Sequence, residues 1–212
     1  MRAAALAMTA AFAAGACSSS VPETRYYQLA VPTRARAGGG SVAIAVAPLT
    51  TENAYDDQRI VYRLTPYRLD YYNYHHWSAT PGTLIGNFLE QAFARSGRFR
   101  AVTREASSAV PVTLGGRVVA IEEVDASKTS WLGRIVLELE LTDSVTGEVL
   151  WAQQLEETEP LATQSPEGLA RALTTAMQRI TQRVLPVVAE LAERQAQAHQ
   201  AAHDARAARL GP

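Results

Sequence analysis

The sequence predicts an α+β fold: a single domain in which a mainly antiparallel or mixed sheet is covered on one face by two helices. Three observations lead to this prediction. Strand and helix patterns follow one another in the order strands, helix, strands, helix, and short turn-forming segments separate neighbouring strands. Residues 134–142 alternate between apolar and mostly polar side chains with a period of two. Two further segments repeat apolar residues at helical spacing.

Residues 1–16 have the features of a secretory signal peptide. Arg2 precedes an apolar run from Ala3 to Ala14, and small residues stand directly before Cys17. The run is shorter than the roughly 20 residues that a transmembrane helix requires. We therefore expect cleavage before Cys17, which is the single cysteine of the chain and has no partner for a disulfide. The alternative is an ordinary signal peptide followed by an incidental cysteine.

Residues 15–17 resemble the bacterial lipobox, in which the cysteine thiol receives a diacylglycerol and the new amino terminus is acylated. Ala14 stands where a lipobox usually has leucine. Residues 17–24 form a polar tether with too few apolar groups to fold alone. Ser18 after the cysteine is similar to the pattern of lipoproteins sent to the outer membrane. We expect an acyl anchor at Cys17, since several acyl chains on one residue give stable membrane binding.

Chain length and charge limit the remaining possibilities. The 212 residues are enough for one domain with a buried core and few for two. The formal net charge is −1, and loss of Arg2 with the signal peptide makes the mature protein slightly more acidic. Because the chain has no basic excess, we expect no nucleic-acid partner.

The amino-terminal half predicts two short strands and an aromatic hairpin. The strands are residues 25–29 and 41–47, separated by a glycine-rich linker at 34–40. The second has valine and isoleucine on one face and only alanine on the other, which suits a central position in a sheet. Residues 59–77 are rich in tyrosine and are interrupted at residues 65–66, which predicts a hairpin or a pair of edge strands.

The first helix is predicted to begin at Pro81 and to stop at Gly97. Thr80 stands at the N-cap position, and proline is favoured at the first helical position. Apolar residues then follow at helical spacing, so one face can lie on a sheet: Leu84, Ile85, Phe88, Leu89, Ala92 and Phe93.

Four strands are predicted after this helix: residues 99–102, 112–124, 134–142 and 148–155. The alternation in residues 134–142 predicts an antiparallel strand with one face in water. Residues 143–147 consist largely of turn-forming types and predict a hairpin between the last two strands.

The second helix is predicted from Ser165 as the cap, with Pro166 and Glu167 in its first turn. Pro186 is expected to kink or interrupt it. Residues 193–212 have little apolar content and are expected to be a frayed helix or a disordered tail. The apolar stripe of the helix consists of Leu169, Leu173, Met177, Ile180, Val184, Leu185, Val188 and Leu191.

Five features of the chain form one pattern: the lipobox and tether leading into residues 25–29, residues 41–48, residues 57–63, Trp77 before the capped helix, and the 147–151 hairpin with the closing helix. This pattern resembles the auxiliary lipoproteins of ABC-type transport systems. The family includes paraquat-inducible lipoprotein C and its relatives, which work with mammalian-cell-entry (MCE) type proteins in moving lipid between bacterial membranes. The resemblance covers residues 17–191 and leaves the tail unexplained.

The resemblance implies an auxiliary lipoprotein domain over residues 25–192, between the tether and the tail at 193–212. It also implies a lipid anchor at Cys17 on the periplasmic face of the outer membrane. The implied partners are an MCE-type periplasm-spanning protein and its ABC transporter.

Aromatic and basic residues gather in the 59–77 segment, and such groups are favoured at protein interfaces and at lipid headgroups. As a patch they are our candidate surface for a partner or for lipid. The alternative for any single member is a core position, because half-buried strands favour aromatic residues. The candidate residues are Arg59, Tyr62, Arg63, Tyr67, Arg68, Tyr72, Tyr74 and Trp77.

Possible catalytic and metal-binding residues form no recognisable set. His75 and His76 are sequential, so in a strand they face opposite sides. His199 and His203 would share a helical face in a polar tail, and two histidines are fewer than the three or four ligands that zinc needs. No nucleophile motif or phosphate-binding glycine loop occurs. We expect no enzymatic activity, no metal and no cofactor.

Three functions remain open on the sequence alone. The first is a non-catalytic accessory subunit of an intermembrane lipid transporter, and the second is an envelope-assembly lipoprotein that regulates a peptidoglycan or secretion machine. The third is an envelope hydrolase, for which no set of catalytic groups stands out. The partner distinguishes the first two. Sheet edges and apolar helices also allow a homo-oligomer.

Overall fold

The computed structural model describes residues 22–31, 39–105, 107, 110–127 and 129–209. Cys17, the signal peptide and most of the tether and linker therefore lie outside the described residues. The strands are β1 (Arg25–Tyr27), β2 (Ala43–Val46), β3 (Thr50–Thr51), β4 (Arg59–Thr65), β5 (Arg68–Trp77), β6 (Ala101–Thr103), β7 (Val112–Ser127), β8 (Ser130–Asp143) and β9 (Val149–Pro160). The helices are α1 (Pro81–Ala94) and α2 (Pro166–Arg209), and a short 3₁₀ turn, η1, spans Asn53–Tyr55.

The sheet is built on the long strand β7. On one side β7 pairs with β8 in an antiparallel ladder, and β8 pairs in the same way with β9. The other side of β7 is shared by three strands in succession, because β2, β3 and β4 each pair with a different part of it in parallel. Beyond these lie β6 next to β2, and β5 and β1 next to β4. The result is the mixed sheet that the sequence predicts.

Gly116 allows β7 to change neighbours along its length. It has a positive φ of 144°, and a Cβ at this position would lie 2.0 Å from the carbonyl oxygen of Glu138. Glycine is therefore required here, because a side chain would collide with the backbone of β8. The residue lies between Leu114, which pairs with β2, and Arg117, which pairs with β3.

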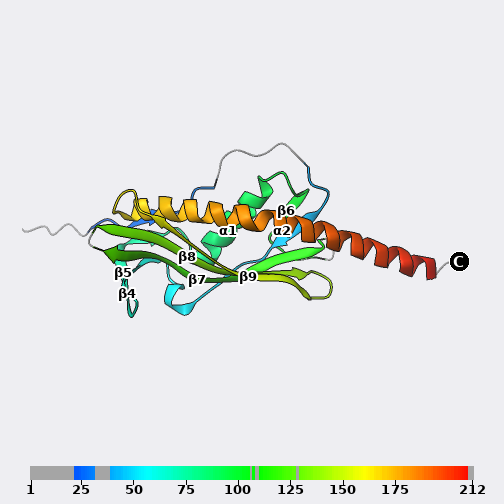
Figure 1. Cartoon of the computed structure of the whole chain (residues 1–212), viewed down its shortest axis with the longest axis horizontal. Coiled ribbons are helices and arrows are strands. Elements are labelled where there is room, and N and C mark those ends of the chain that lie inside the picture. Colours follow the sequence, from blue (N-terminus) through cyan, green and yellow to red (C-terminus); the bar gives the residue numbers. More distant parts are fainter. Residues whose placement is uncertain (1–21, 32–38, 106, 108–109, 128, 210–212) are drawn as a thin grey trace, which may run out of the picture.

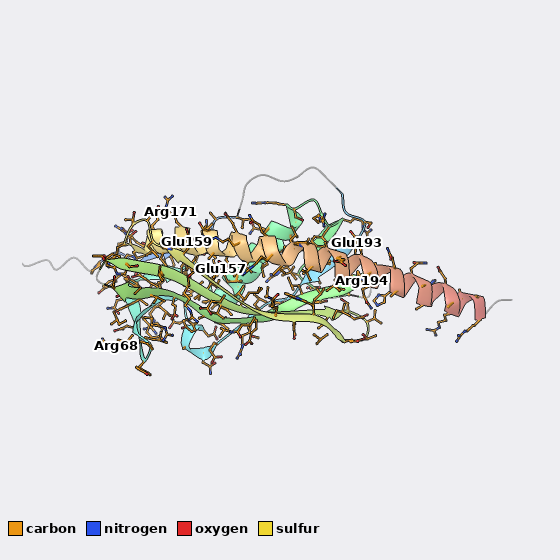
Figure 2. All side chains as sticks on the ribbon, in the orientation of Figure 1. Arg68, Glu157, Glu159, Arg171, Glu193 and Arg194 are labelled. Atoms are coloured by element: carbon orange, nitrogen blue, oxygen red, sulfur yellow. The ribbon has the colours of Figure 1, made fainter. Side chains whose placement is uncertain are left out.

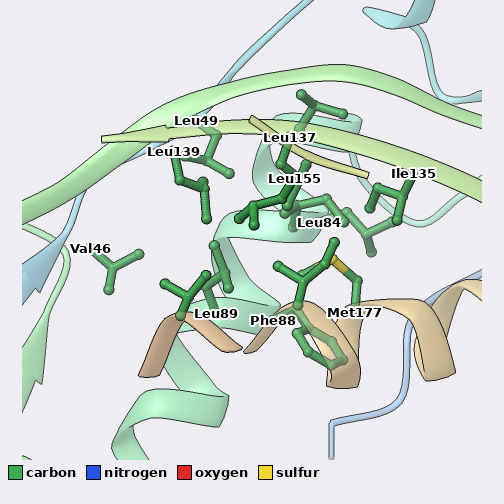
Figure 3. Close-up of a cluster of buried hydrophobic side chains, with 14 of the residues drawn as sticks. Val46, Leu49, Leu84, Phe88, Leu89, Ile135, Leu137, Leu139, Leu155 and Met177 are labelled. Atoms are coloured by element: carbon green, nitrogen blue, oxygen red, sulfur yellow. The ribbon is translucent and has the colours of Figure 1, made fainter. Parts of the chain in front are cut away.

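Both helices cover the same face of the sheet (Figure 1). A single core contains Phe88 of α1, Met177 of α2 and Leu137 of β8 (Figure 3). The predicted α+β class, with two helices on one face, is confirmed. The opposite face of β8 is less exposed to solvent than predicted. Val136 is buried on that face, and η1 packs against β7 on the same side of the sheet.

The two helices begin differently from one another. Ser165 caps α2 as predicted, because its Oγ accepts a hydrogen bond from the backbone N–H of Gly168 at 3.0 Å. Thr80 does not cap α1 with its side chain, which donates instead to the Oγ1 of Thr83. The N–H of Gly82 is satisfied by the Oγ1 of Thr51, on β3. The cap of α1 therefore comes from a distant segment.

The helix α2 continues through Pro186, so the predicted interruption at this residue is wrong. Beyond His199 its residues up to Arg209 are exposed, and Figure 1 shows this end of the helix projecting past the sheet. Alanine has the highest helix propensity, which accounts for a helix without packing partners in this alanine-rich segment. Within the described residues, neither helix is both long enough and apolar enough to cross a bilayer.

Candidate functional site

The β4–β5 hairpin carries all the residues of the candidate surface, but they occupy three different environments. Tyr67, Arg68 and Tyr74 are exposed, whereas Arg59, Tyr62, Arg63 and Tyr72 are half-buried. Trp77 is 1% exposed and belongs to the hydrophobic core. Its assignment to the surface is therefore wrong: it ends β5 beneath the helices, where its large ring is excluded from water.

The tip of the hairpin is its most exposed part. Tyr67, in the turn between the strands, is 99% exposed. Arg68 follows at the start of β5 and makes a weak, exposed ion pair with Asp70 at 3.4 Å. The tip extends away from the helices, and Arg68 lies at its far end (Figure 2). An aromatic side chain without packing contacts, next to an arginine, is typical of a binding surface.

The outer face of the hairpin, opposite the helices, carries a second exposed group. The guanidinium carbon of Arg59 lies 4.5 Å from the centroid of the Tyr71 ring, and Asp57 accepts hydrogen bonds from its Nε and Nη2. Tyr26 of β1 is 64% exposed, and its ring lies 5.8 Å from that of His76. Tyr26 was not among the predicted residues, because nothing in the sequence indicates that β1 pairs with β5, about fifty residues away.

A buried ionic cluster lies behind this outer face. Glu122 of β7 is completely buried, and its carboxylate accepts hydrogen bonds from three side chains. Tyr55 donates at 2.6 Å, Arg63 at 3.0 Å and Arg134 at 2.8 Å. Burial, together with the hydrogen bond to Glu122, raises the pKa of Tyr55 to about 12. Arg63 thus holds β4 against β7, and its charge is neutralised within the protein rather than offered to a ligand.

The next residue of β7, Glu123, faces the opposite side of the sheet, toward α2. It is 2% exposed, and its carboxyl oxygens lie 3.3 and 3.4 Å from the donating hydroxyl of Tyr72. Burial and the neighbouring charge of Asp125 raise the pKa of Glu123 from an ordinary 4.5 to about 7. Burial also raises the pKa of Tyr72, with a further contribution from Glu123.

Aromatic rings connect Glu123 to the edge of the sheet. Tyr62 and Tyr72 have ring centroids 5.0 Å apart, and Tyr72 meets His75 edge-on at 5.6 Å. The ring of His75 lies beside Tyr27 of β1, whose hydroxyl is 2.9 Å from the histidine Nδ1. Desolvation, with smaller contributions from Arg25 and His76, lowers the pKa of His75. Tyr62 and Tyr72 therefore belong to the interior side of the hairpin.

The histidines lie in separate places. His75 contacts Tyr27 whereas His76 contacts Tyr26, as expected for sequential residues of one strand. His199 lies 2.8 Å from Asp143 Oδ2, which links α2 to the β8–β9 turn. This contact could not be predicted from the sequence, because the two residues are 56 positions apart. In the part of the chain that the structure describes, no group of three or more histidine, cysteine, aspartate or glutamate side chains is arranged to hold a metal.

Comparisons with known proteins give a consistent result. A model of the family described as ABC-type transport auxiliary lipoprotein component matches residues 27–185. The solved structure of protein XCC0632 from Xanthomonas campestris is similar, with a TM-score of 0.71 and 20% sequence identity, covering 82% of this chain and 99% of that one. An uncharacterised protein has a TM-score of 0.65 at 12% identity, covering 79% and 99%. These structures support the fold alone. No curated protein matches the sequence significantly.

Proposed function

The chain belongs to the family of ABC-type transport auxiliary lipoprotein components, and we propose that it is a non-catalytic accessory subunit of an MCE-type ABC system for intermembrane lipid transport. In this proposal the acylated Cys17 anchors it to the periplasmic face of the outer membrane, and the exposed part of the β4–β5 hairpin docks on the MCE-type protein. The anchor is supported by the lipobox-like residues 15–17 and by the family.

The docking part of the proposal rests on the exposure of Tyr67. A tyrosine that packs against nothing contributes little to folding, yet it can bury a large ring on a partner. Arg68 beside it adds a guanidinium that suits planar acceptors such as carboxylates. Arg63 of β4 binds Glu122 of β7 and also the carbonyl oxygen of Pro66, so the strand that leads into the tip is held in place.

An affinity pull-down from mildly solubilised envelopes tests the partner. The wild-type protein should recover an MCE-type protein together with components of the ABC transporter. The Cys17→Ser variant should recover markedly less, because it leaves the membrane surface where the partner is concentrated. Recovery of peptidoglycan-synthesis or secretion proteins without a transporter component would overturn the proposal in favour of an envelope-assembly lipoprotein.

A matched pair of surface variants tests the docking site. The double variant Tyr67→Ala and Arg68→Ala should recover at least tenfold less partner while its thermal unfolding stays unchanged. The control is Val145→Ala, which changes another exposed apolar residue, in the β8–β9 turn. If both variants bind as the wild type does, or both lose binding equally, the hairpin tip is not the docking surface.

A further inference from the structure

Two adjacent glutamates of β7 are both buried, but their carboxyl groups have different hydrogen-bond donors. On the outer face, Glu122 receives hydrogen bonds from two arginines and a tyrosine. On the helix face, Glu123 receives one long hydrogen bond, from Tyr72. Arg63, which binds Glu122, and Tyr72, which binds Glu123, both come from the β4–β5 hairpin. Each carboxyl group is thus a point at which the hairpin is attached to β7.

We propose that Glu123 is a pH-sensitive switch that sets how firmly the β4–β5 hairpin is held against β7. The protonated carboxyl is compatible with its buried place between the hairpin and α2. The carboxylate is not, because burial of a charge without a counter-charge is costly. Loss of the proton therefore favours opening of the hairpin on its inner side, which brings water to Glu123. This inference does not depend on the identity of any partner.

The surroundings of Glu123 provide no counter-charge. From β7 itself comes Asp125, whose Oδ1 is buried without a hydrogen-bond partner. From β4 and β5 come Tyr62, which is in register with Glu123, and Tyr72. Within the described residues no basic group contributes to the shifted pKa of Glu123, and the charge that acts on it is that of Asp125. Two carboxyl groups on one face thus favour retention of a proton.

The other two elements around Glu123 are apolar at this point. Its register partner on β8 is Gly133, which carries no side chain. A Cβ on Gly133 would meet Leu169, Ala172 and Leu173 of α2 at 3.2–3.3 Å. Aliphatic side chains of the helix therefore cover the β8 side of Glu123. His75 lies behind Tyr72, and desolvation lowers the pKa of His75, which favours its neutral form. Among the described residues, the hydroxyl of Tyr72 is therefore the group that stabilises the carboxylate, and no basic side chain supports it.

The ladder that attaches the hairpin to β7 is short, so one ionisable side chain can change how stably it is paired. The ladder between β4 and β7 comprises Val61, Tyr62 and Arg63, opposite residues 122–124. Glu123 lies in the middle of this ladder, and no other stretch of β4 pairs with β7. Its pKa of about 7, against an ordinary 4.5, places the change between weakly acidic and neutral pH. Since each pKa unit corresponds to a factor of ten in the equilibrium, opening should increase up to roughly a hundredfold across this range.

Amide hydrogen exchange of the full folded chain at pH 5 and at pH 8, corrected for intrinsic exchange rates, tests the switch. The amides of the β4–β7 ladder should lose up to roughly a hundredfold in protection at the higher pH. Amides of the β8–β9 ladder serve as the internal reference and should not change. Glu123→Gln, which cannot ionise, should keep its protection at both pH values.

Two further variants make the result decisive. Glu122→Gln is the matched control: it should lower protection of the hairpin at both pH values and keep the pH dependence of the wild type. Asp125→Asn, which removes the repelling charge, should move the transition in protection to lower pH. This variant tests the switch if Glu123→Gln does not fold. The proposal is overturned if Glu123→Gln or Asp125→Asn shows the same pH profile as the wild type, or if the ladder is equally protected at both pH values.

Discussion

The two hairpins of the sheet differ in how they are held. The β8–β9 hairpin is closed by Asp143, whose carboxylate accepts hydrogen bonds from the amides of Val145 and Thr146 and from His199 of α2. Along β9, Arg179 and Arg183 of α2 form ion pairs with Glu157. The helix thus fastens this hairpin from the turn to the far end.

The β4–β5 hairpin is fixed at its base and free at its tip. Its base contains the buried Trp77, and Arg63 ties β4 to Glu122 of β7, whereas the side chain of Tyr67 at the tip is 99% exposed. The β8–β9 hairpin, which is covered by α2, contributes to the stability of the domain. The tip of the β4–β5 hairpin instead leaves the side chain of Tyr67 exposed, as the docking role that we propose requires. The following changes test this difference, from the largest expected effect to the smallest.

Trp77→Ala should destabilise the domain by about 3–5 kcal/mol, because it leaves a large cavity in the core beneath the hairpin. Urea unfolding followed by circular dichroism measures the loss. Trp77→Phe is the control and should lose less, since it keeps an aromatic ring in the same place. A loss below about 1 kcal/mol for the alanine variant would contradict the assignment of this residue to the base of the hairpin.

Asp143→Ala should destabilise the domain by about 2 kcal/mol at neutral pH. Although burial raises the pKa of Asp143, the hydrogen bonds from the turn amides and from His199 hold it at about 2, below its ordinary 3.8. This contribution is present above pH 3.8 and is lost as the pH falls through 2, because the native carboxylate must then accept a proton.

Unfolding free energies measured between pH 7 and pH 2 check this prediction. The curves of the wild type and of Asp143→Ala should converge at the acid end, whereas the exposed Asp204→Ala should follow the wild type throughout. Parallel curves for the wild type and Asp143→Ala would show that the turn does not depend on this carboxylate.

Tyr67→Ala should change the unfolding free energy by no more than about 0.5 kcal/mol, because an exposed side chain at a turn loses no packing. The same urea experiment measures it, and Tyr71→Ala is the comparison. Tyr71 is half-buried and donates a hydrogen bond to the carbonyl oxygen of Ala54, so its removal should cost more. Equal losses would mean that the tip is packed as firmly as the base.

Local patterns predicted much of the fold. The alternation of residues 134–142 identified β8, and turn-forming residues at 143–147 identified the β8–β9 hairpin. Pro81 and Ser165 located the starts of both helices within a residue. These signals are readable because they depend on neighbours within a few positions, where backbone geometry fixes which side chains share a face.

The candidate site was predicted only in part. The sequence placed aromatic and basic residues together on one hairpin, and the exposure of Tyr67 and Arg68 agrees with a surface role. It could not separate Trp77, which is core, from Tyr67, which is exposed, because both lie in strand-like segments of the same composition. Glu122 and Glu123 were not predicted as part of a site, since a pair of glutamates in a strand is ordinarily solvated.

The sequence by itself predicted the α+β class, both helices and most of the strands, while acylation at the lipobox-like residues before Cys17 stays a prediction. The tertiary structure alone decided that β2, β3 and β4 share one edge of β7 and that β1 pairs with β5. It also decided that Glu122 is neutralised by arginines while Glu123 is left with a tyrosine and another acid. The physical reason is that burial and charge pairing arise between residues far apart in the chain, and their positions are fixed by strand register, which no local period specifies.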